Sequence, residues 1–113
     1  MATINKVDFD EVVDEALKAA KAVFSDNWDQ ARDIIENIAK ALANDVSFIA
    51  KKKLSGEFNE DDARIYLEDQ KMLARVRLRS IAIISLQIAE NIWNAIADVF
   101  RQAIQKALDW TLL

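Results

Sequence analysis

The chain has 113 residues, which is room for a single domain that spans residues 1–113. It has a net charge of −4 and contains one glycine and no proline. Turn-rich β folds need glycine and proline at their corners, so the composition excludes them and predicts an all-α fold. Cysteine and histidine are both absent, which excludes disulfides and thiolate chemistry and removes the commonest general base and metal ligand.

The first predicted helix covers about residues 9–24. Apolar residues recur at helical spacing throughout this range, and Asp8 or Asp10 can cap its first turn. The segment 25–27 consists of a serine, an aspartate and an asparagine, all good cap residues, which either end this helix or kink it. The chain therefore either continues in the same direction or folds back on itself, and the sequence leaves both open.

The second predicted helix covers about residues 28–54. It carries two neighbouring apolar rows, so its apolar face is wide, as in helix bundles. We expect it to stop at Gly56, because glycine suits the left-handed position that follows a helix. Asn59 can cap the next helix, so the connection is short and predicts two antiparallel neighbours.

The third predicted helix covers about residues 60–110 and is exceptionally long. After Asn59 we find no glycine, no proline and no cluster of cap residues before Trp110. Read literally, this segment is one rod of roughly 50 residues, or about 75 Å. Together with residues 28–54 it predicts a long antiparallel helical hairpin.

Residues 81–100 are apolar around most of the helix circumference. A narrow polar strip that includes Gln87, Asn91 and Asp98 interrupts them, which argues against a membrane span. Two hairpins packed as a homodimeric, four-helix-type bundle would cover this surface, whereas a first helix that folds back would permit a monomer. The predicted interface residues are Ile81, Ile84, Ile88, Ile92, Trp93, Ile96, Phe100 and Trp110.

Lys71, Arg75 and Arg79 follow one another at four-residue spacing and are a possible anion ridge. We favour the simpler interpretation, a solvated face balanced by acidic neighbours such as Glu68. The acidic net charge argues against nucleic acid as a partner. No cofactor or metal site is expected, because the familiar metal-binding bundle motif needs histidine.

No nucleophile–base pair or glycine-rich phosphate loop can be assembled, so we do not expect an enzyme. The leading hypothesis is a non-catalytic interaction or assembly module that acts through helix–helix packing, with a homodimer or another helical protein as partner. Two alternatives are the binding of an apolar small molecule in the bundle core and a metal site built from carboxylates alone. The N-terminus is acidic and lacks an export signal, so the expected location is the cytoplasm.

Overall fold

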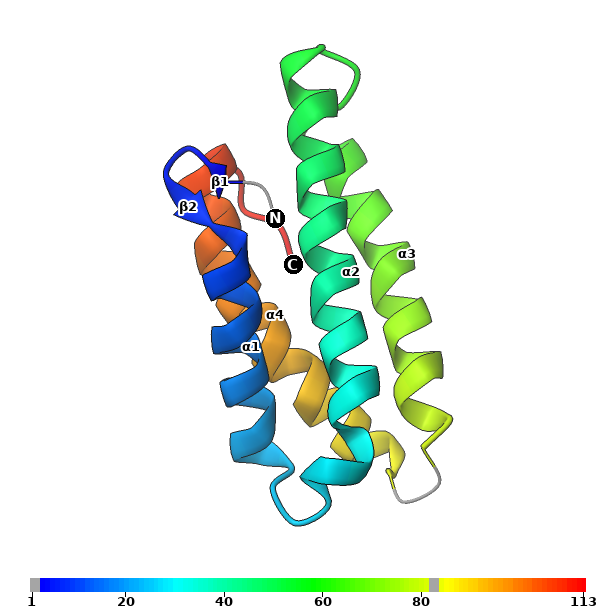
Figure 1. The fold of residues 1–113 in the computed structure, drawn as a ribbon. Coiled ribbons are helices and arrows are strands. Elements are labelled where there is room, and N and C mark those ends of the chain that lie inside the picture. The colour runs from blue at the N-terminus through cyan, green and yellow to red at the C-terminus, as the bar shows by residue number, and fades with distance from the viewer. Residues whose placement is uncertain (1–2, 82–83) are drawn as a thin grey trace.

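The computed structural model describes residues 3–81 and 84–113 and confirms the all-α prediction. Its described part has four helices and one short two-stranded hairpin (Figure 1). None of these helices is long and apolar enough to cross a membrane. The elements are β1 Thr3–Ile4, β2 Val7–Asp8, α1 Phe9–Val23, α2 Trp28–Leu54, α3 Glu60–Arg79 and α4 Leu86–Leu108.

The first helix folds back onto the second. Asp8 caps α1, because its side chain accepts a hydrogen bond of 2.9 Å from the backbone N–H of Asp10. The turn at 24–27 then reverses the chain, and α1 and α2 lie antiparallel (Figure 1). The structure thus decides between the two arrangements that the sequence left open.

The predicted hairpin of the second and third helices is present in α2 and α3 (Figure 1). Gly56 has φ of +76°, the left-handed conformation expected after a helix. Asn59 and Asp62 form a reciprocal capping box, with hydrogen bonds of 2.8 and 3.1 Å. Gly56 and the cap residues therefore predicted the position of this turn correctly.

The predicted single helix over residues 60–110 is wrong. The structure ends α3 at Arg79 and starts α4 at Leu86, with residues 82 and 83 outside the described part. Ser85 has an extended backbone, and its Oγ accepts a 3.2 Å hydrogen bond from the N–H of Ile88, as an N-cap does. Ser80 Oγ donates to the carbonyl of Arg77 at 2.6 Å. A helix can thus end and restart between serines without glycine or proline.

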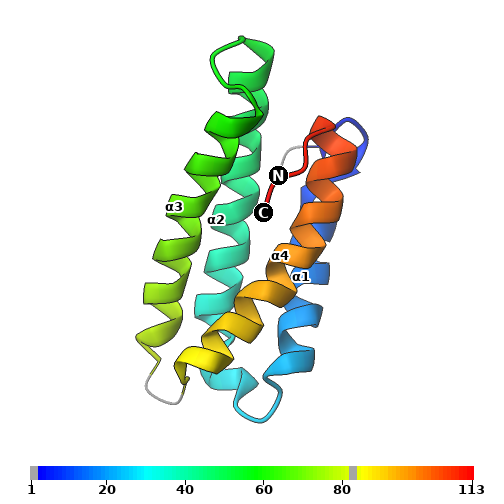
Figure 2. The same cartoon turned by 180° about the vertical axis from the view of Figure 1, so that it is seen from behind.

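The break lets α4 fold back across α1 (Figure 2). The two helices share much of the core, and the rings of Phe9 and Phe100 lie fully buried with centroids 6.3 Å apart. Burial of an apolar side chain of this size stabilises the fold by about 2–3 kcal/mol. Packing against α1 therefore shelters the apolar surface of α4 within one chain.

The C-terminal segment 109–113 turns into the space between the α1–α4 pair and the α2–α3 pair (Figure 1). Leu112 is only 1% exposed there. The backbone N–H of Thr111 donates to a carboxylate oxygen of Glu60 at 2.9 Å, and Lys53 Nζ lies 4.8 Å from the centre of the Trp110 ring. This segment therefore joins the two helix pairs.

Candidate interaction surface

The predicted interface residues belong largely to the core of the single chain. The three that remain partly exposed, Ile81, Ile88 and Trp110, pack against that core. The apolar excess that suggested a dimer through α4 is therefore already covered by the chain's own helices. The other five are at most 4% exposed: Ile84, Ile92, Trp93, Ile96 and Phe100.

A different apolar surface lies on α3. Four large side chains there, which we call the outer face of α3, are each between 52% and 69% exposed: Ile65, Met72, Leu73 and Val76. Residues seven and four positions apart lie along one line of a helix, which aligns Ile65, Met72 and Val76. The buried side of α3 is opposite this line and consists of Ala63, Leu67, Ala74 and Leu78. Ile65, Met72 and Val76 therefore point away from the body of the domain, and Leu73 lies at the edge of this face, where it lines a small pocket shared with α2 and α4.

Aromatic side chains border this surface where α2 meets α3. Phe48 of α2 stacks on Tyr66 of α3 with ring centroids 5.2 Å apart, and Phe58 meets Phe48 edge-on at 5.9 Å. Phe48 remains partly open to solvent. This contact holds α3 against α2 and leaves the outer face free.

A hydrogen bond also joins α2 and α3. The hydroxyl of Tyr66 donates to Oδ1 of Asp45 at 3.3 Å. Desolvation raises the pKa of the Asp45 carboxyl above its usual value, while the Tyr66 hydrogen bond and the charge of Arg77 oppose this rise. The same burial, together with the Asp45 charge, raises the pKa of Tyr66. The Tyr66–Asp45 hydrogen bond therefore helps to hold α2 against α3.

The three residues of the possible anion ridge lie in different environments. Arg75 is partly buried, and its Nε faces the Glu90 carboxylate of α4. Lys71 is also partly buried, whereas Arg79 is exposed at the end of α3. With Arg75 paired to Glu90, the ridge is not a cluster of three free cations.

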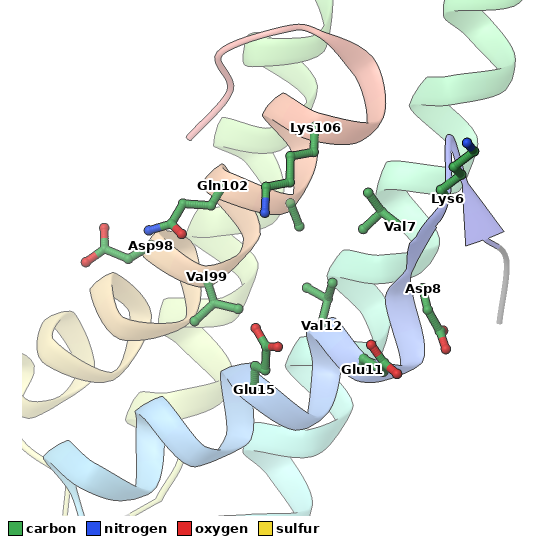
Figure 3. A pocket seen from close by; sticks show the side chains of 11 residues that line it. Lys6, Val7, Asp8, Glu11, Val12, Glu15, Asp98, Val99, Gln102 and Lys106 are labelled. Atoms are coloured by element: carbon green, nitrogen blue, oxygen red, sulfur yellow. The ribbon is translucent and has the colours of Figure 1, made fainter.

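A groove of about 360 Å³ lies between the start of α1 and the end of α4 (Figure 3). Four carboxylates line it beside two lysines, Lys6 and Lys106. One carboxylate, Asp8, caps α1, and another, Asp98, accepts a 2.7 Å hydrogen bond from Arg101. In the described residues no three acidic, histidine or cysteine side chains are grouped to hold a metal. The groove is therefore a polar surface in which two of the four carboxylates already accept hydrogen bonds from groups of α1 and α4.

The packing of α2, α3 and α4 around Trp93 leaves a pocket of about 20 Å³, lined also by Leu42 and Ala74. That volume is about the space of one water molecule. This pocket is therefore too small for an apolar small molecule.

The chain matches no protein-family model, no curated protein and no solved structure. The fold alone therefore defines the class, an all-α domain of two antiparallel helix pairs. Sequence reasoning missed the outer face of α3. The signal was present as apolar residues at 65, 72 and 76, on the opposite side of the helix from the buried alanines and leucines.

Proposed function

We propose that the protein is a non-catalytic interaction module that binds a helical protein partner through the outer face of α3. One observation carries this proposal: a well-packed domain leaves four large apolar side chains of a single helix more than half exposed. Contiguous exposed apolar surface in a soluble fold usually marks a binding site.

The spacing of the outer face suits a helix as the partner. Ile65, Met72 and Val76 occupy the a and d positions of a heptad, the positions that insert between side chains of a facing helix. One charged residue, Glu68, borders the row, and another, Asp69, lies within it between Ile65 and Met72. Charged residues in and beside such a row influence the choice and orientation of a partner helix.

A photo-crosslinking amino acid placed at Met72 tests this proposal in the native host. We expect a discrete covalent adduct from Met72 and none from the same amino acid at Asp14, which lies exposed on α1. Adding Val76→Asp should remove the Met72 adduct, because a charge in the apolar row costs binding energy. Equal adducts from both positions, or a Met72 adduct that survives Val76→Asp, would contradict the proposal.

A further inference from the structure

We propose that the partner is a second copy of this chain, bound through antiparallel pairing of α3 with the partner's α3. The inference rests on the proposed function and names the partner for the same surface. Three properties of α3 support it: the distribution of charge along the helix, the register of its exposed row, and the exposure of every residue in that row.

Charge divides α3 into two halves. Residues 60–69 carry five acidic side chains and one arginine, whereas residues 71–79 carry four basic side chains and no acid. Acids at the start of a helix and cations at its end stabilise the helix dipole, but that effect is confined to the first and last turns. Here the division continues to the centre, where Asp69 and Lys71 are two residues apart. Antiparallel pairing places the acidic half on the basic half, while parallel pairing would oppose like charges.

The register of the exposed row agrees with a two-fold axis near residues 70 and 71. In antiparallel coiled coils each a position meets a d position of the other helix. The three kinds of a–d pair in α3 join position 62 to 79, 65 to 76 and 69 to 72, and all are centred on the same axis. Ile65 packs on the partner's Val76 and forms two apolar layers by symmetry. The outermost layer pairs Asp62 with the partner's Arg79, which are of opposite charge. The central layer places Met72 beside the partner's Asp69.

Every residue of these layers is exposed in the single chain, namely Asp62, Ile65, Asp69, Met72, Val76 and Arg79. A second α3 can therefore approach without displacing any described element of the fold. Two helices of 20 residues make a contact at the small end of the range for specific complexes. A polar residue at the central layer fixes the register at a cost in stability. We therefore expect a reversible dimer with a dissociation constant on the order of micromolar.

Sedimentation equilibrium of the full chain tests the pairing, with circular dichroism to confirm that each variant folds. Val76→Asp should weaken the dimer by about tenfold or more, because it puts a carboxylate against the partner's Ile65. Val23→Asp is the matched control, since Val23 is also exposed but lies at the end of α1. It should leave the dimer unchanged.

A gain of affinity gives a second, independent readout. Asp69→Leu replaces the charge that faces the partner's Met72, and it should tighten the dimer by about tenfold. The same substitution at the exposed Asp14 of α1 should have no effect. Raised salt should weaken the wild-type dimer, because opposite charges face one another along the pairing.

Two results would overturn the inference: a chain that stays monomeric at about 300 μM, or a dimer that Val76→Asp does not weaken. The photo-crosslinking result separates this failure from failure of the proposed function. A Met72 adduct with a different protein would retain the interaction module and exclude self-pairing. A monomeric chain with no specific Met72 adduct would remove both.

Discussion

Helices α3 and α4 differ in where their apolar side chains point. α4 is the more apolar helix, yet Ile92, Ile96 and Phe100 are fully buried within the chain. α3 carries charges along its whole length, yet its outer face leaves Ile65 and Val76 about two-thirds exposed. The number of apolar residues therefore does not locate an interface. What matters is whether the same chain supplies a surface to cover them.

The largest expected contrast between the two helices is in stability. Phe100→Ala should lower the free energy of unfolding by about 3–5 kcal/mol, because it opens a cavity beside the buried ring of Phe9. Met72→Ala should change the free energy of unfolding of dilute, monomeric protein by less than about 0.5 kcal/mol. Denaturant titration of both variants measures the difference. Similar losses would mean that Met72 is covered within the chain and that the contrast between α3 and α4 fails.

A smaller effect probes the break that lets α4 fold back. Ser85→Ala removes the side-chain oxygen that accepts a hydrogen bond from the N–H of Ile88, so the free energy of unfolding should fall by about 1 kcal/mol. Ser25→Ala, at an exposed position between α1 and α2, serves as a comparison because the side chain of Ser25 caps no helix. Thermal or chemical denaturation measures both. No loss on Ser85→Ala would indicate that the helix does not start at this residue.

The smallest effect concerns the contact that holds α3 against α2. The pKa of Asp45 is raised in the folded chain, so the folded state binds this proton more readily than the unfolded state. The ionised Asp45 therefore lowers stability above its folded pKa, and this penalty is lost as the pH falls below the ordinary value of 3.8. Asp45→Asn should accordingly stabilise the chain at pH 7 by less than about 1 kcal/mol.

Denaturant titrations of wild type and Asp45→Asn across pH 3 to 7 provide the measurement, because the other carboxyl groups titrate alike in both proteins. The advantage of the variant should shrink as the pH is lowered. An Asp45→Asn protein that is less stable than wild type at pH 7, by a margin that grows with pH, would show that the charge itself stabilises the contact.

Local signals in the sequence predicted much of the fold. Gly56 and the Asn59–Asp62 capping box mark the α2–α3 turn because backbone conformation and end groups act over a few residues. The end of α3 could not be predicted in the same way. Ser80 and Ser85 are weak signals, and the break is favoured by packing of α4 on α1, which connects residues far apart in the chain.

The candidate site was harder to predict from the sequence than the fold, and for the same reason. Phe100 and Ile96 have the side chains of an interface, and only the packing of the other helices around α4 makes them core, as the contact of Phe100 with Phe9 of α1 shows. Conversely, Ile65 and Met72 are ordinary apolar residues of a charged helix until the opposite side of α3 is seen to be the buried one. The direction of a helix face depends on tertiary contacts that no local pattern contains.

The most direct test of self-pairing through α3 is the distance between spin labels in the dimer. The chain has no cysteine, so a single introduced cysteine labels one site in each copy. Antiparallel pairing predicts a separation along the helix axis of roughly 30 Å for labels at Asp61→Cys and below about 10 Å for labels at Glu68→Cys. Equal separations at the two sites, or no distance between copies at either, would contradict the account.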